Sequence, residues 1–317
     1  MQNATIKSRK INKKKVMRTL FIISFTIVPI LSFLIFYIYV NFSSFVMAFQ
    51  LPDDGTLQFV GLENFKWIFQ KIRNGSMDET DNLRIAFLNT FKTFGIQMIL
   101  LPIGLFNSYF IYKKIWGYKI FRIIFYIPSL VSSVVVCFFF TELMSSSGFM
   151  PKLLQNLYNL EYVPAPLVDS RFANKMVFLN LIWLGFPGNL IIWGGTFSRI
   201  PDSIIESAKL DGVNWIREMF QIILPLVWPT LVLVLTTSFA GLFGASGNVF
   251  LLTGGGYYGT QTVSNWMYLR VQQSTNPERS PNLYRVSAMG MMLTAVSCVI
   301  AVLIRKFLTS KIEETQY

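Results

Sequence analysis

Long apolar stretches alternate with short polar segments along the chain. Six of the stretches are long enough to cross a bilayer, which takes about 20 apolar residues. They are residues 19–40, 85–112, 123–141, 176–196, 222–245 and 286–304. Backbone groups in the hydrocarbon core need hydrogen-bond partners within the protein, so each stretch is predicted to be helical. The pattern predicts an all-α, polytopic membrane protein with six transmembrane helices.

The composition agrees with a membrane protein and argues against most kinds of enzyme active site. Hydrophobic residues make up 53% of the 317 residues and charged residues 14%, whereas soluble chains carry about 25% charged residues. The chain has no histidine, the commonest general base and metal ligand. Its two cysteines, Cys137 and Cys298, lie in apolar runs, so neither a disulfide framework nor a metal cluster is indicated. We therefore assign no catalytic and no metal-binding residue.

The net charge of +12 is unevenly distributed along the chain. If both termini are cytoplasmic, the inner segments 1–18, 112–122, 199–222 and 305–317 hold 17 Lys and Arg in 66 positions. The outer segments 41–84, 143–175 and 247–285 hold only 10 in 116 positions. This asymmetry predicts a multi-pass protein of the plasma membrane with both termini in the cytoplasm. The basic N-terminal segment is expected to face lipid headgroups, and no nucleic-acid partner is expected.

The segment between the fourth and fifth predicted spans, residues 201–225, carries the most informative local pattern. Ser203, followed three residues later by Glu206, has the spacing of a capping box that begins a helix. Gly212 can end that helix because glycine readily adopts a positive φ. The two residues after Glu206 are small, so we expect a partner surface to approach this helix closely.

A second helix is predicted after this turn. Apolar residues near the 3.6-residue period place one face of it at Val213, Ile216, Phe220 and Ile223. A pair of prolines, Pro225 and Pro229, is expected to kink the entry to the fifth span or to mark its start. The segment therefore predicts a short helix, a sharp turn and an amphipathic helix at the cytoplasmic face.

This loop resembles the EAA loop of ABC-importer permease subunits. The pattern of that family is Glu-Ala-Ala, three residues, Gly, nine residues and then Ile-x-Leu-Pro. The matching residues here are Glu206, Ser207, Ala208, Gly212, Ile222, Leu224 and Pro225. Serine replaces the first alanine and keeps the small size. The resemblance implies that coupling to an ATPase is carried by Glu206, Ser207, Ala208, Asp211, Gly212, Phe220, Leu224 and Pro225, of which Asp211 and Phe220 are typical of the carbohydrate branch.

Shorter segments point to the MalF-like, binding-protein-dependent side of the carbohydrate permease family. They are residues 60–65, 88–90 and 252–256. The resemblance implies the type I ABC importer permease fold, with a MalG-like second permease subunit, two cytoplasmic ABC ATPase subunits and an extracytoplasmic solute-binding lipoprotein. The sequence contains no Gly-x-x-x-x-Gly-Lys-Ser/Thr phosphate loop. We therefore expect no cofactor on this chain, with ATP and Mg²⁺ on the partner ATPase.

The same resemblance predicts the organisation of the chain. Residues 1–18 form a basic cytoplasmic tail, and residues 19–84 hold the first span with an extracytoplasmic loop. Residues 85–307 form the ABC importer transmembrane domain, with five helices and the EAA loop at 201–225. Residues 308–317 form a cytoplasmic tail.

Candidate substrate-path residues come from the fourth and fifth predicted spans and the loop after them. Sugar sites combine aromatic surfaces with neutral hydrogen-bonding groups, and polar groups at membrane depth usually face the bundle interior. The candidates are Asn180, Trp183, Asn189, Trp193, Thr237, Ser246 and Asn248. Hydrogen bonding between helices, or interfacial anchoring of the tryptophans, is the alternative role for these side chains.

The function expected is ATP-driven import of a carbohydrate, an oligosaccharide in particular. An importer of the same class for a polyol or a glycerophosphodiester fits the loop equally well, because the loop contacts the ATPase and not the cargo. A secondary transporter fits less well, since the predicted spans hold no Asp, Glu or His. A membrane-embedded enzyme also fits poorly, because the chain has no histidine and no cluster of carboxylates in the predicted spans.

Overall fold

The computed structural model describes residues 13–53, 56–78, 81–158, 163–274 and 280–310. Most of the predicted N-terminal tail and most of the predicted C-terminal tail lie outside the described residues.

The described part of the chain is almost entirely helical, with one two-stranded hairpin. The first half contains α1 (Lys13–Ser32), the π-helix η1 (Phe33–Tyr39), α2 (Val40–Met47), β1 (Gln50–Asp53), β2 (Thr56–Phe59), α3 (Glu63–Asn74), α4 (Leu83–Tyr112), α5 (Tyr118–Leu130), α6 (Ser133–Leu143) and α7 (Phe149–Tyr158). The second half contains η3 (Pro166–Val168), α8 (Ala173–Gly185), α9 (Leu190–Phe197), α10 (Asp202–Leu210), α11 (Trp215–Arg217), the π-helix η4 (Glu218–Ile223), α12 (Leu224–Ala240), η5 (Leu242–Gly244), α13 (Val249–Thr253), α14 (Val263–Gln272) and α15 (Pro281–Thr309).

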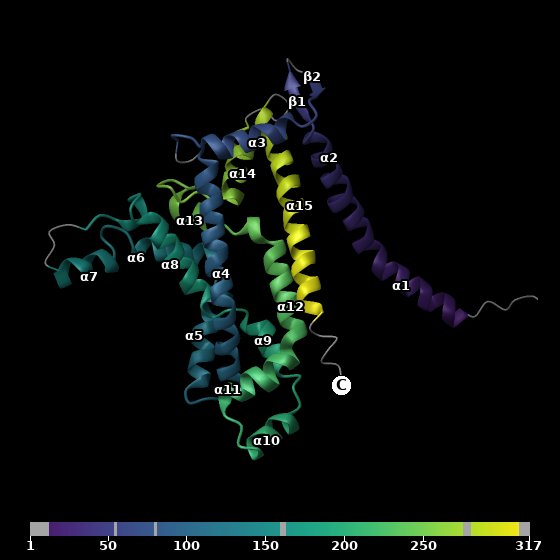
Figure 1. The fold of residues 1–317 in the computed structure, drawn as a ribbon, viewed down its shortest axis with the longest axis vertical. Helices are drawn as coiled ribbons and strands as arrows, with labels where there is room; N and C mark the ends of the chain where they lie inside the picture. Colours follow the sequence, from purple (N-terminus) through teal and green to yellow (C-terminus); the bar gives the residue numbers. More distant parts are fainter. Residues whose placement is uncertain (1–12, 54–55, 79–80, 159–162, 275–279, 311–317) are drawn as a thin grey trace, which may run out of the picture.

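The multi-span, all-helical membrane architecture is confirmed, since the described residues hold five helices long and apolar enough to cross a membrane, or six if one bent pair counts as a span. The helices are Met17–Met47, Leu83–Tyr112, Ala173–Phe197, Trp215–Ala240 and Pro281–Thr309. Figure 1 shows α4, α12 and α15 running along the molecule between the β1–β2 hairpin at one end and α10 at the other. We call these the hairpin end and the α10 end.

The third predicted span, residues 123–141, is not one straight helix. The region forms α5 and α6, which meet at an angle of 102°. Pro128 lies in the last turn of α5 and lacks a donor N–H. The backbone then becomes extended at Val131 and Ser132. A proline so close to the end of α5 weakens its hydrogen bonding where the chain turns.

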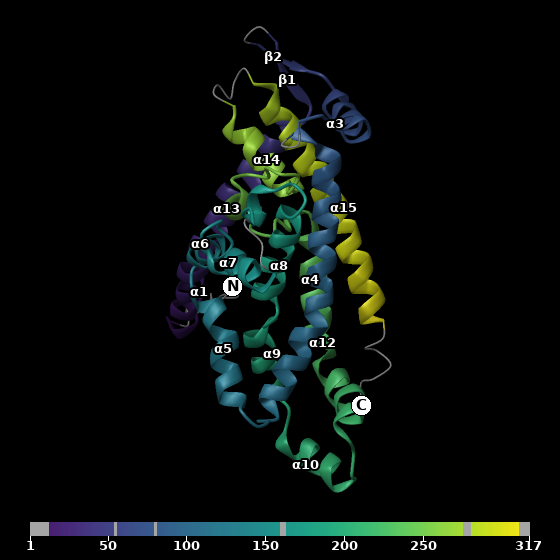
Figure 2. The ribbon, with the colours of Figure 1, turned by 90° about the vertical axis from the view of Figure 1, so that its left-hand side faces the viewer.

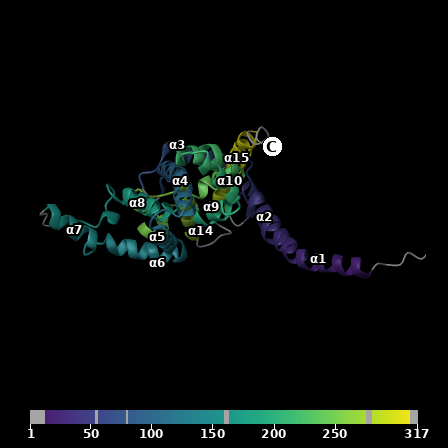
Figure 3. The ribbon, with the colours of Figure 1, turned by 90° about the horizontal axis from the view of Figure 1, so that it is seen from below.

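Most of the first span stands apart from the other helices. Its last helix, α2, packs against α15, whereas α1 and η1 lean away from the bundle (Figure 3), and none of the span's most apolar window is buried within this chain. The side chains there are exposed Phe, Ile, Leu and Val. Such a surface suits lipid or another membrane helix.

The fourth span is broken between α8 and α9, and α4 packs directly against the break. Gly188, in the break, has a φ of +66°. A Cβ added to Gly104 of α4 would lie only 2.6 Å from the Cα of Gly188. The backbone freed by the break finds a partner in α4, because Asn107 Nδ2 donates to the carbonyl of Phe186 at 2.9 Å. Figure 2 shows α8 and α9 beside α4 as two separate segments.

Two apolar clusters fix the ends of the bundle. At the α10 end, α4 packs against α9, η4 and α12 around the fully buried Trp193, Phe197 and Ile223. At the hairpin end, α4 packs against α3, α14 and α15 around Trp266 and Met289. Helix α4 contributes side chains to both clusters, so it connects the hairpin end of the bundle with the α10 end.

Replacing Gly104 with Ala tests the contact between α4 and the break. The added methyl group should force α4 away from Gly188 at a cost of about 1–3 kcal/mol. We expect a lower midpoint of thermal unfolding in detergent. Gly194→Ala is the matched control, because a Cβ there would meet no atom within 4 Å. Equal unfolding midpoints for the two variants would contradict the close approach.

Candidate functional site

The loop between the fourth and fifth spans folds as a helix and a tight turn. Helix α10 begins at Asp202 with Pro201 at its N-cap, and no side chain caps it. The predicted capping box from Ser203 is therefore wrong. Pro201 sets an extended backbone (φ −61°, ψ 132°) and Asp202 supplies a negative charge in the first turn, so Ser203 falls inside the helix.

The predicted glycine stop at the other end of α10 is confirmed. Gly212 has a φ of +68°. Its N–H donates to the carbonyl of Lys209, and the N–H of Val213 donates to the carbonyl of Ala208, both at 3.1 Å. This pair of bonds is a Schellman motif. It fixes the direction in which the chain leaves α10.

Helix α10 buries one side and exposes the other. Ile205 and Ala208 are buried within the chain, so Ala208 is not available to a partner. Glu206 and Ser207 are exposed. Leu210 lies four residues after Glu206 on the same exposed side, and 89% of its surface is accessible. The sequence reasoning left Leu210 out of the candidate site, although its i+4 spacing from Glu206 indicated it.

The predicted apolar face of the second helix is only partly correct. Ile223 is buried, but Ile216 and Phe220 are about half exposed, and Glu218 and Met219 are buried instead. The reason is the π-helix η4 at Glu218–Ile223, which widens the turn and shifts side chains away from a 3.6-residue period. Such bulges often occur at functional sites.

The remaining predicted coupling residues surround this widened turn. Asp211 is the exposed C-cap of α10. The ring of Phe220 meets the edge of Phe106 of α4, with centroids 6.0 Å apart. Leu224 packs partly against the α10-end cluster, and Pro225, at the second position of α12, is exposed.

A buried ion pair joins η4 to α4. Lys113 Nζ lies 2.7 and 2.8 Å from the two carboxylate oxygens of Glu218. Glu218 is only 3% exposed. A buried carboxylate needs such a partner because its desolvation is expensive. The pair therefore ties the segment that follows α10 to the end of the second span, 105 residues away in sequence.

A cavity of about 420 Å³ lies beside the break in the fourth span. It is lined by Gln97, Met98, Leu100, Leu101, Leu181, Leu184, Gly185, Gly188, Asn189, Ser238 and Asn248. We call it the central cavity. It brings together Asn189 and Asn248, two of the predicted path residues. Gln97 and Ser238 also line the cavity but were not among the candidates chosen from the sequence, although each is a polar residue inside an apolar run.

The other predicted path residues do not line this cavity. Asn180 is fully buried, with neither amide atom hydrogen-bonded. Trp193 is fully buried in the α10-end cluster, where its role is packing. The ring of Trp183 stacks on Phe140 with centroids 6.1 Å apart.

Thr237 and Ser246 also lie outside the lining. Thr237 is exposed and its hydroxyl donates to carbonyls of its own helix. Ser246 is half-buried.

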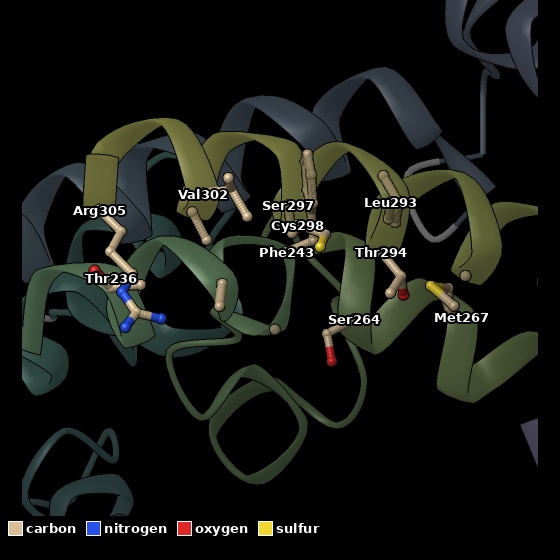
Figure 4. Close-up of a pocket in the computed structure, with 14 residues that line it drawn as sticks. Thr236, Phe243, Ser264, Met267, Leu293, Thr294, Ser297, Cys298, Val302 and Arg305 are labelled. Carbon is tan, nitrogen blue, oxygen red and sulfur yellow. The ribbon is translucent and has the colours of Figure 1, made fainter. Parts of the chain in front are cut away.

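A second cavity of about 530 Å³ lies between α12 and α15 (Figure 4). Its wall is mostly apolar, with hydroxyl groups of Thr236, Ser264, Thr294 and Ser297 and with Arg305 toward one end. None of the predicted path residues lines it.

The fold is that of a multi-span helical membrane protein. The chain belongs to the family of binding-protein-dependent transport system inner membrane components, whose model matches residues 100–314. It is similar to the arabinooligosaccharides transport system permease protein AraP of Bacillus subtilis, 29% identical over 226 residues, which are 69% of this chain and 67% of that protein.

The matches to other relatives cover a smaller share of those proteins' length. The maltose/maltodextrin transport system permease protein MalF of Vibrio parahaemolyticus is 32% identical over 146 residues, 46% of this chain and 28% of that protein. The galactooligosaccharides transport system permease protein GanP of Bacillus subtilis is 25% identical over 252 residues, 73% of this chain and 58% of that protein.

A solved structure shares the fold. It is the crystal structure of a bacterial ABC transporter involved in the import of the acidic polysaccharide alginate. The TM-score is 0.75 with 20% identity, and the match covers 94% of this chain and 98% of that one. The fold class predicted from the resemblance is therefore confirmed.

Breaking the Lys113–Glu218 pair should destabilise the α10 end. Lys113→Met leaves a buried carboxylate unpaired, at a cost of roughly 3 kcal/mol. Adding Glu218→Gln should recover most of that loss, because no buried charge is then left alone. The measurement is unfolding in mixed micelles by denaturant titration. Lys114→Met, at the exposed neighbouring lysine, should change little. Additive losses in the double variant would rule out the coupling.

Proposed function

We propose that this chain is a permease subunit of an ATP-driven importer that takes up a carbohydrate, and specifically an oligosaccharide. The observation that carries the proposal is the family match over residues 100–314, together with the helix–turn segment 201–225 exposed at one end of the bundle. The relatives AraP, GanP and MalF are named for transport of arabinooligosaccharides, galactooligosaccharides, and maltose and maltodextrins. These names support an oligosaccharide as the cargo.

The transporter we propose has several subunits. A second, MalG-like permease completes the membrane part, and two cytoplasmic ABC ATPases carry ATP and Mg²⁺. An extracytoplasmic solute-binding lipoprotein delivers the sugar. The family description names binding-protein dependence, and another solved structure, of a bacterial alginate ABC transporter, is a complex with an alginate pentasaccharide-bound periplasmic protein. Both support the solute-binding partner.

In this proposal the α10 end faces the cytoplasm, and so do both termini. The ATPase receives the exposed side of α10, at Glu206, Ser207 and Leu210. Motion of α10 passes into α12 through the continuous helix Trp215–Ala240 and into α4 through Lys113 and Glu218. Rigid helices and a paired charge are suitable parts for such coupling, because they resist bending and separation.

We further propose that the central cavity is this subunit's share of the sugar path. Non-helical backbone at membrane depth is tolerated where it is buried or lines a water-filled cavity, and the break near Gly188 lines this cavity. The side chains offered are amides and a hydroxyl, from Gln97, Asn189, Ser238 and Asn248. These neutral groups suit the hydroxyls of a sugar.

The cavity lining also ranks the alternative cargoes. A polyol presents the same hydroxyl groups and remains the second candidate. A glycerophosphodiester carries a charge, and the described residues lining the central cavity hold no cation to stabilise it. A secondary transporter does not fit the family to which the chain belongs.

Leu210→Asp tests the coupling surface. An exposed apolar residue at the tip of α10 should pack against the ATPase, so a charge there should abolish co-purification of the ATPase subunits while leaving membrane insertion intact. Trp116→Asp is the matched control, because Trp116 is 95% exposed in another loop near the α10 end. The proposal fails if the Leu210 variant retains its ATPase and transports at the normal rate.

Asn189→Ala and Gln97→Ala test the sugar path. Each removes hydrogen bonds worth about 1 kcal/mol or more, so we expect the concentration for half-maximal uptake to rise about five- to tenfold. Uptake of radiolabelled oligosaccharide into proteoliposomes is the measurement. Thr294→Ala, in the second cavity, is the control. A larger effect at Thr294 than at Asn189 would move the path to the second cavity.

A further inference from the structure

A third cavity lies at the hairpin end, away from both sites described above. It measures about 300 Å³ and lies between β1, α3 and the first turns of α15. Its lining consists of Leu51, Glu63, Asn64, Lys66, Trp67, Gln70 and Arg285. Figure 2 shows α3 at the hairpin end of the bundle, with α15 leading away from it. We call this cavity the outer socket.

Arg285 lies in the socket without a carboxylate. Its guanidinium carbon is 4.3 Å from the ring centroid of Trp67, and its Nε is buried with no hydrogen-bond partner. Among the described residues no acid lies within ion-pair distance of it. A partly buried guanidinium is normally paired, and stacking on Trp67 replaces only part of its hydration. An acidic group entering the socket would supply the missing partner.

The neighbouring acid is already occupied by other groups. Asp81 forms ion pairs with Lys71 and with Arg270. It also accepts a hydrogen bond from the indole N–H of Trp266 at 3.2 Å. Burial lowers the pKa of Lys71, and the positive charges of Arg270 and Arg285 lower it further, while Asp78 opposes the shift. Asp81 is therefore already paired with two other cations, Lys71 and Arg270.

The socket offers an acceptor as well as cations. Asn64 is fully buried, and its Nδ2 donates to the carbonyls of Ala48 and Gln50, both at 2.9 Å. Its Oδ1 has no partner. A peptide segment presents both groups that are needed here, a carboxylate for Arg285 and Lys66 and an N–H for Asn64. Glu63 lines the socket too, so the incoming acid must lie on the side of Arg285 and Lys66.

Exposed apolar side chains near the socket favour a protein over a free small molecule. Leu62, at the N-cap of α3, and Phe69 of α3 are each 61% exposed. Figure 1 shows the hairpin projecting at the extreme end of the molecule, next to α3. A polar centre with large apolar residues around it is a common arrangement at protein–protein interfaces.

We propose that the outer socket receives an acidic side chain of the extracytoplasmic solute-binding protein, with Arg285 and Lys66 binding its carboxylate and with Leu62 and Phe69 beside α3 available for apolar contact with that protein. This docking surface rests on the proposed function, because it requires that the hairpin end face the outside and that a solute-binding protein exist.

The test measures how tightly the solute-binding protein that co-purifies with the complete transporter binds to that transporter in nanodiscs. Arg285→Gln and Lys66→Gln should each weaken binding about tenfold or more, because each removes one of the two cations that bind the docked carboxylate. Binding to the wild type should weaken with added salt, and binding to the Arg285 variant should respond less. Arg84→Gln is the matched control, since Arg84 is an exposed cation near the hairpin end and outside the socket. Lys66 is exposed on α3, so its variant is informative even if Arg285→Gln folds poorly.

The outcomes separate this inference from the proposed function. If no solute-binding protein binds the wild type, the proposed function itself is wrong. If the wild type binds and both socket variants bind equally well, only the docking surface is wrong. It is also wrong if the variants reduce uptake of an acidic sugar while leaving the affinity for the solute-binding protein unchanged, because the socket would then bind the free carboxylate. A conclusive positive result is restored binding when Arg285→Glu is combined with a lysine at one acidic position of the solute-binding protein.

Discussion

The contact between Gly104 and Gly188 is the constraint on which the membrane part of this chain depends. A break inside a span leaves backbone carbonyls without partners, and in a membrane such groups must be satisfied by protein or by a water-lined cavity. Here α4 comes close enough for Asn107 to bond the carbonyl of Phe186, and only residues without a Cβ permit that approach. The central cavity opens beside the same break. One backbone contact therefore supports the broken span and decides where a polar cavity can lie.

The two ends of α4 are fixed by different chemistry. At the hairpin end the fully buried amide of Asn89 donates to the carbonyls of Gly259 and Gln261 and accepts from Asn174. At the α10 end the ion pair of Lys113 and Glu218 holds the widened turn η4. Polar bonds of this kind have narrow geometry, whereas apolar packing tolerates sliding. In the proposed coupling, a displacement of α10 reaches α4 through this ion pair and through the packed cluster at the α10 end.

The spans were predictable because 20 apolar residues in a row have few alternatives to a membrane helix. The glycine turn after α10 was also predictable, since a positive φ strongly favours glycine. The bend after Pro128 and the π-helix at Glu218 were not, because the apolar periodicity runs through both places without interruption. The exposed Phe220 and the buried Met219 follow from that π turn. Lys113 and Glu218 are 105 residues apart, and nothing in either local sequence marks the other as its partner.

The central cavity contains predicted amide side chains, Asn189 and Asn248, but neither of the predicted tryptophans. Trp183 is engaged with Phe140 and Trp193 with the α10-end cluster, and the described lining of the central cavity contains no aromatic ring. Pyranose rings bind best between an aromatic face and hydrogen-bonding groups. Within the proposed function, this chain supplies amides and a hydroxyl to the sugar path, and we propose that the aromatic face comes from the other side of that path. In the proposed importer with two permease subunits the facing surface belongs to the second permease, so this proposal divides specificity for the sugar between the two: hydrogen bonds from this chain and stacking from its partner.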